Sequence, residues 1–75
     1  VLIIPNKEIA KVSNSEDSDK ELLGHLLLVS KKIADKYSLN DNYRLVINNG
    51  ADAGQSVFHI HVHLLGGRGL TWPPG

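Results

Sequence analysis

The 75-residue chain lacks cysteine and methionine, and its eight basic side chains are balanced by eight acidic ones. Without cysteine, no disulfide framework can compensate for the small core of so short a chain, which is expected to form one small domain. The zero formal charge gives no indication of a polyanionic partner or a charged membrane surface. No apolar run approaches the ~20 residues that cross a bilayer, so no membrane partner is expected. The missing cysteine also favours an intracellular location.

What the chain does have is a strict alternation of histidine and apolar residues near its C-terminal end. A period of two is typical of a half-buried strand. We expect the apolar members to face a core, namely Phe58, Ile60, Val62 and Leu64. The histidines would then form a row on the other face, with neighbours roughly 6.6 Å apart, at His59, His61 and His63.

Three interpretations fit such a row. A zinc ion needs each ring nitrogen at about 2.0–2.1 Å, and His59 and His63 lie too far apart on a straight strand, so no metal is expected. A second interpretation is that these are solvent-exposed histidines without a role. It would suit a single histidine, but the row holds three of the four histidines in the chain. The third interpretation is nucleophilic catalysis, because a neutral imidazole is well populated at pH 7 and can attack phosphorus. His61 is then the predicted nucleophile, flanked by rings that bind phosphate oxygens or protonate the leaving group.

The rest of the chain predicts an α+β fold, with an antiparallel sheet and one long helix packed on one face. Residues 1–4 are predicted to form a buried strand. Residues 43–48 are predicted to form a second strand, which should make an antiparallel hairpin with the histidine strand. Apolar residues spaced by three and four predict an amphipathic helix of about 18 residues, with the stripe Leu22, Leu23, Leu26, Leu27, Val29, Ile33, Ala34 and Tyr37. Ser18 and Glu21 fit a capping box at its start. His25 is expected to be a surface residue.

The segment before the histidines, residues 49–55, is either an ordinary hairpin connection or part of a phosphate site. Gly54 lets the backbone approach a ligand closely, and N–H groups exposed in a turn can bind an anion. Beside three histidines we favour the phosphate site.

The run His59-Ile60-His61-Val62-His63-Leu64-Leu65 resembles the motif of the histidine triad superfamily. The longer run from Asn48 to Arg68, with the ending Trp72-Pro73-Pro74-Gly75, resembles its histidine triad nucleotide-binding branch. This resemblance implies a purine nucleoside phosphoramidase without a cofactor. Such an enzyme hydrolyses the P–N bond of adenosine or guanosine 5′-phosphoramidates (AMP- or GMP-type substrates) through a nucleotidyl-histidine intermediate.

The resemblance also implies roles for individual residues. The implied catalytic residues are His59, His61, His63 and Ser56, whose hydroxyl would lie by the leaving group. The implied nucleotide contacts are Asn48, Gly54, Gln55, Ser56, His61, Val62 (through its backbone) and His63. The family is a homodimer, in which Trp72 would shape the substrate pocket of the partner subunit.

Further expectations concern the extent, competence and location of the protein. Residues 1–75 would be the C-terminal portion of a single histidine triad domain, whose upstream strands and part of the nucleoside pocket precede Val1. The isolated portion would then not be a competent enzyme. The expected location is cytoplasmic, and a nuclear or mitochondrial one stays open.

Two other functions remain open from the sequence. One is a nucleotide-binding adaptor with unidentified protein partners and little catalysis, and the other is a dinucleoside polyphosphate hydrolase of a sister branch. His63 argues against the related nucleotidyl transferases, which carry glutamine there. The ending from Trp72 to Gly75 argues for the phosphoramidase branch.

Overall fold

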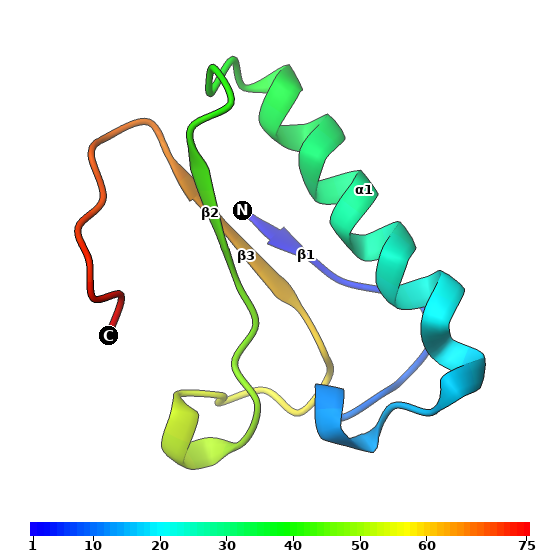
Figure 1. Cartoon of the computed structure of the whole chain (residues 1–75). Coiled ribbons are helices and arrows are strands. Elements are labelled where there is room, and N and C mark those ends of the chain that lie inside the picture. The colour runs from blue at the N-terminus through cyan, green and yellow to red at the C-terminus, as the bar shows by residue number, and fades with distance from the viewer.

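Strand β3 (Val62–Gly66) is the centre of a three-stranded antiparallel sheet in the computed structural model, which describes residues 1–75 (Figure 1). Strand β1 (Leu2–Ile3) pairs with one side of β3, and strand β2 (Tyr43–Val46) pairs with the other. The predicted antiparallel pairing of the second strand with the histidine strand is therefore confirmed. The strand order β1-β3-β2 makes the histidine-bearing strand the one with neighbours on both sides.

The pleat of β3 separates a core face from a histidine face. Val62 and Leu64 are buried, and they lie opposite Ile3 of β1 and Leu45 of β2. His63 lies between them in sequence, so its side chain projects from the other face. A period of two thus buries Val62 and Leu64 and leaves His63 half-buried, as the alternation predicted.

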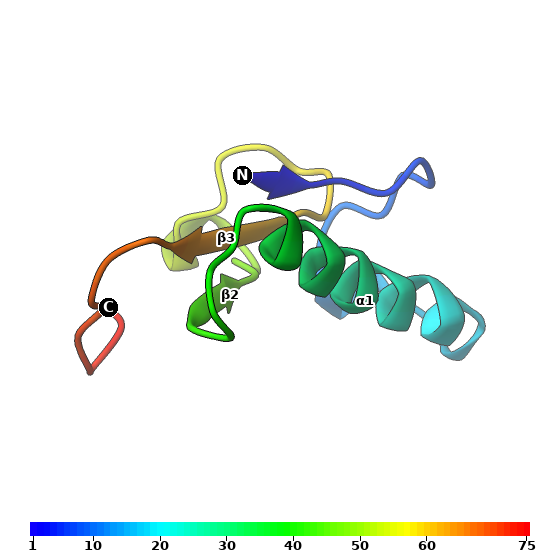
Figure 2. The same cartoon turned by 90° about the horizontal axis from the view of Figure 1, so that it is seen from above.

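Helix α1 (Lys20–Lys36) covers the core face of the sheet, and Figure 2 shows it along one side of the strands. The buried cluster between helix and sheet consists of Ile3, Leu26, Ala34, Val62 and Leu64. Burial of this apolar surface holds the helix on the sheet. None of the helices combines the length and the hydropathy needed to cross a lipid bilayer.

The predicted helix is confirmed, but its predicted stripe is partly wrong. Leu27 is 49% exposed and Tyr37 is 59% exposed, because both point away from the narrow contact with the sheet. Ser30 is fully buried instead, and its hydroxyl donates a 2.7 Å hydrogen bond to the carbonyl of Leu26. A serine whose hydroxyl bonds back to the preceding turn can face a core, which hydrophobic periodicity does not reveal.

The predicted capping box at Ser18 is also wrong. Short 3-10 helices precede the helix and interrupt the loops, at Val12–Asn14, Asp17–Asp19 and Ala51–Ala53. The second of them places Asp19 directly before α1, and its carboxylate accepts the N–H of Glu16 at 2.8 Å. Lys7 also forms an ion pair with Asp19, so this carboxylate ties the helix start to the chain near β1.

All three strands differ in extent from the prediction, and β2 ends at Val46 rather than at residue 48. The ladder of β3 begins at Val62 and not at Phe58, and Phe58 is 54% exposed rather than part of the core. The connection from β2 to β3 therefore spans residues 47–61, longer than a tight hairpin loop. In the first strand only Ile3 is buried, so the expectation of a fully buried strand over residues 1–4 was wrong.

Candidate active site

The three histidines differ in secondary structure. His63 belongs to β3, whereas His59 and His61 lie in the irregular segment that leads into it. Ile60 between them is 1% exposed, and its N–H donates to the carbonyl of Ile9 at 2.7 Å. The predicted alternation of buried apolar residues and half-buried histidines thus holds from Ile60 to Leu64, although its first part is fixed by a loop rather than by a strand.

The ring of His61 is oriented by the backbone of its own segment. Its Nδ1 lies 2.7 Å from the carbonyl oxygen of His59. A carbonyl oxygen only accepts hydrogen bonds, so Nδ1 of the neutral ring carries the proton and donates it. The lone pair of the neutral imidazole is then on Nε2. This tautomer, assigned from the carbonyl partner, is the one that a nucleophilic Nε2 requires.

The rings of His61 and His63 form a pair, and His59 is held elsewhere. The centroids of His61 and His63 are 5.0 Å apart with an interplanar angle of 69°, an edge-to-face arrangement. His59 places its Nε2 3.0 Å from the carbonyl of Pro5, to which it donates. The evenly spaced row is therefore replaced by a pair of rings plus a third ring anchored to the loop after β1. No group of three or more His, Cys, Asp or Glu side chains is placed to bind a metal ion.

The loop before the triad is held in shape by Gln55, whose side chain is 3% exposed. Its Oε1 accepts the N–H of Gly50 at 2.8 Å, and its Nε2 donates to the carbonyls of Ala10 at 2.6 Å and Val57 at 3.1 Å. The side-chain amide predicted to contact a nucleotide is thus fully engaged inside the protein. It joins the loop to the segment after β1 in the same way as His59 does.

The predicted phosphate loop also uses its N–H groups internally. Gly54 adopts the left-handed conformation with φ of 97°, and its N–H donates to the carbonyl of Ala51 at 3.0 Å. The N–H of Gln55 donates to Gly50 at 3.1 Å. A Cβ added at Gly54 would lie 3.7 Å from Nδ2 of Asn48, which brings these two predicted contacts together.

The remaining predicted site residues are placed differently from one another. Ser56 is exposed directly after the Gln55 anchor, and Asn48 is half-buried two residues after the end of β2. Val62 is fully buried, and its backbone pairs with Ile3. Trp72 is 80% exposed, so it is not a core residue.

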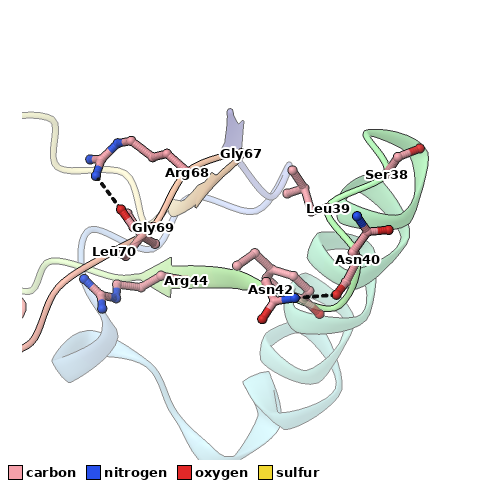
Figure 3. A pocket seen from close by; sticks show the side chains of 10 residues that line it. Ser38, Leu39, Asn40, Asn42, Arg44, Gly67, Arg68, Gly69 and Leu70 are labelled. Atoms are coloured by element: carbon pink, nitrogen blue, oxygen red, sulfur yellow. Dashed lines mark hydrogen bonds between the residues drawn. The ribbon is translucent and has the colours of Figure 1, made fainter.

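None of the cavities in the structure is lined by a triad ring. A cavity of about 490 Å³ brings Asn48 and Trp72 together along β2. A second cavity, of about 660 Å³, is lined by the turn after α1, the start of β2 and the residues after β3 (Figure 3). Arg44 lines both. Sequence analysis missed Arg44, whose only signal was its alternation with Tyr43 and Leu45 on β2.

Residues 1–70 match the family model of the HIT domain. Two curated relatives, uncharacterized HIT-like proteins of Synechocystis and Synechococcus elongatus, are 53% and 51% identical to all of this chain, which corresponds to 66% of each relative. The chain therefore belongs to the HIT domain family, the histidine triad superfamily. It spans a little under two-thirds of the length of these relatives.

Solved structures agree with this assignment. A HIT family hydrolase from Legionella pneumophila superposes with a TM-score of 0.95 at 52% identity, covering 99% of this chain and 67% of that one. A histidine triad nucleotide-binding protein from Candida albicans gives 0.73 at 35% identity, covering 96% and 57%. The predicted fold, an antiparallel sheet with one long helix, is confirmed by the structure and by these neighbours.

Proposed function

We propose that the protein hydrolyses purine nucleoside 5′-phosphoramidates at the P–N bond, with His61 as the nucleophile. The observation that carries this proposal is the 2.7 Å contact between Nδ1 of His61 and the carbonyl of His59, which leaves Nε2 unprotonated in the neutral ring. Membership of the HIT domain family supports it, and so do neighbours described as HIT family hydrolases from Legionella pneumophila and Clostridium thermocellum. The nucleotide-binding protein of Candida albicans supports a nucleotide substrate.

The reaction follows from the two paired rings. Nε2 of His61 attacks phosphorus, the P–N bond breaks, and the amine leaves with a proton donated by His63. The nucleotide is then joined to Nε2. A water molecule attacks that phosphorus, gives a proton back to His63, and releases the nucleoside 5′-monophosphate and free His61. The 5.0 Å separation of the ring centroids supports this division of roles, because it keeps His63 beside the reacting centre.

His59 acts as a positioning residue in this proposal. Its carbonyl orients His61, and its ring is anchored on Pro5. Ser56 is exposed and free to hydrogen-bond the leaving group. Asn48, beside Gly54, forms the phosphate side of the site through its side chain, because the N–H of Gly54 already donates to the carbonyl of Ala51. Gln55 contributes by holding this loop rather than by touching the nucleotide through its amide.

We also propose that the protein is a homodimer in which Trp72 of one subunit selects among leaving groups in the substrate pocket of the partner subunit. The outer edge of β2 pairs with no strand of this chain, and a free edge is a natural place for a second copy to add. Trp72, at 80% exposure, is available for a ligand. No cofactor is required by any step.

The test is capture of the intermediate in the whole protein. Adenosine 5′-phosphoramidate radiolabelled at phosphorus is mixed with the protein, the reaction is quenched in alkali, and the labelled peptide is identified. We expect label on His61, and we expect His61→Ala to lower turnover by roughly 10⁴-fold or more. His25→Ala is the matched control, because His25 is exposed on α1. Label on another residue, or normal turnover by His61→Ala, would refute the assignment.

A further inference from the structure

We propose that the pair Asn49-Gly50 is a site of spontaneous deamidation, and that the side chain of Gln55 protects it while the loop is folded. The modification needs no partner and no nucleotide, so this proposal is independent of the proposed function. Its structural consequence falls on the loop between β2 and the triad segment.

Asn49 is the only one of the chain's six asparagines that is followed by glycine. Deamidation begins when the backbone nitrogen of the next residue attacks the side-chain carbonyl carbon of asparagine, and glycine has no Cβ to obstruct that attack. The side chain of Asn49 is exposed, and a Cβ built on Gly50 would meet no atom within 4 Å. The residue types and the open space around them therefore suit the reaction.

The proposed reaction is intramolecular and needs only water. The nitrogen of Gly50 loses its proton to hydroxide and forms a bond to Cγ of Asn49. The bond from Cγ to Nδ2 breaks, and Nδ2 takes a proton from water and leaves as ammonia. Water then opens the resulting succinimide ring at one of its two carbonyl carbons, which leaves aspartate or isoaspartate at position 49. Because the reacting groups are adjacent in one chain, no catalyst has to bring them together.

In the folded loop, each of the two reacting groups is held by a hydrogen bond. The N–H of Gly50 donates to Oε1 of Gln55 at 2.8 Å. A hydrogen bond to the protonated form of a group disfavours its deprotonation, so this contact opposes the first step. Oδ1 of Asn49 accepts the N–H of Ser13 at 2.8 Å, which ties the side chain to the 3-10 helix Val12–Asn14. The nitrogen and the amide it would attack are thus directed to different partners.

Gln55 is itself fixed, so it does not release Gly50 easily. Its side chain is 3% exposed, and its Nε2 donates to the carbonyls of Ala10 and Val57. Freeing the N–H of Gly50 therefore requires the loop to open. The rate of deamidation should then follow the fraction of time that the loop spends open.

The two products differ in their effect on the loop. Aspartate keeps the length of the main chain, and its carboxylate can still accept the N–H of Ser13. Isoaspartate carries the main chain through the side-chain carbonyl, which adds one backbone carbon before Gly50. The carbonyl of Gly50 accepts the N–H groups of Ala53 at 3.2 Å and Gln55 at 3.1 Å. An added carbon directly before Gly50 should disrupt these bonds, so isoaspartate should loosen the loop and aspartate should not.

The experiment incubates the whole protein in mildly alkaline buffer, folded or unfolded in urea, and follows deamidation by peptide mass spectrometry. Asn49→Gln identifies the site, because its longer side chain cannot form the same five-membered ring. We expect deamidation of Asn49 to be at least about 10-fold slower in the folded wild type than in urea.

Two variants test the role of Gln55 under conditions where circular dichroism shows them folded. Gln55→Ala and Gln55→Met, which keeps the length of the side chain without its acceptor, should each remove most of the protection. Leu26→Ala is the matched control, because it destabilises the core between helix and sheet without touching the loop. It should raise the rate by less than about 2-fold.

Equal rates in folded and unfolded wild type would overturn the proposed protection. Equal acceleration by the Gln55 variants and Leu26→Ala would show that global unfolding controls the reaction, and would overturn the role of Gln55. The same mass increase in Asn49→Gln would place the modification at another residue. The consequence for the loop is tested by hydrogen exchange at the Gly50 amide, which should be faster in the isoaspartate form than in wild type or Asn49→Asp. Equal exchange in all three would overturn that consequence.

Discussion

Replacing Gln55 by alanine should destabilise the protein strongly, although the residue lies in a loop. Its amide is 3% exposed and makes three hydrogen bonds, with the N–H of Gly50 and the carbonyls of Ala10 and Val57. Each such bond contributes about 1 kcal/mol net. Water can reach some of the released partners, because Ala10 and Val57 are exposed residues. Together with the lost packing we expect a loss of about 2–4 kcal/mol in the free energy of unfolding.

The assay is urea unfolding of the whole protein, followed by hydrogen exchange at the Gly50 amide. Asn42→Ala is the control, because the Asn42 side chain is exposed and donates one hydrogen bond, to the carbonyl of Asn40 at 2.7 Å. It should change stability by less than about 0.5 kcal/mol. Gln55→Ala should also speed exchange at Gly50, which Asn42→Ala should not. A loss below about 1 kcal/mol for Gln55→Ala would show that the three bonds are not what holds the loop.

Two other predictions concern the leaving group and pH. Ser56→Ala and His63→Ala should slow turnover by up to about 10²–10⁴-fold for poor amine leaving groups and by less for good ones, because poor leaving groups depend most on proton donation. Equal slowing across the series would indicate ground-state positioning instead. The hydrogen bond from Lys7, with that from the N–H of Glu16, holds the pKa of Asp19 below its usual value. Its stabilisation is therefore present above the unfolded pKa of about 3.9 and is lost as pH falls through the lower folded value. Asp19→Asn should flatten this acid limb of stability in pH-dependent unfolding, whereas Asp35→Asn, in an exposed ion pair, should not; parallel curves for wild type and Asp19→Asn would contradict this.

The elements that periodicity controls were predictable, and those that single hydrogen bonds control were not. The helix and the core side of β3 follow from apolar spacing, so Leu26, Val62 and Leu64 were placed correctly. Phe58 was placed incorrectly. Before β3 begins, the N–H of Ile60 bonds to the carbonyl of Ile9 in a loop and not to a strand partner, so the segment that contains Phe58 is not part of the sheet. Alternation in sequence continues through that change and does not mark it.

The site shows the same division. The spacing of the histidines predicted a triad and its central member, whereas the tautomer of His61 depends on where one carbonyl oxygen points. The contact of His59 with Pro5 joins residues that are 54 positions apart in the sequence, and that of Gln55 with Ala10 joins residues 45 positions apart. Such contacts are set by the packed fold, so no local pattern in the sequence reveals them.

The acceptor that orients the His61 ring is the main-chain oxygen of His59. The side chain and the backbone of His59 therefore have separate roles. The side chain of residue 59 fastens the segment to Pro5, while its carbonyl sets the tautomer of residue 61. A side-chain carboxylate that orients a histidine can be lost through a single base change. A peptide carbonyl is present whatever residue is encoded. The proton position on the ring of His61, the proposed nucleophile, is thus set by the path of the backbone. It does not change with side-chain substitutions as long as that path is kept.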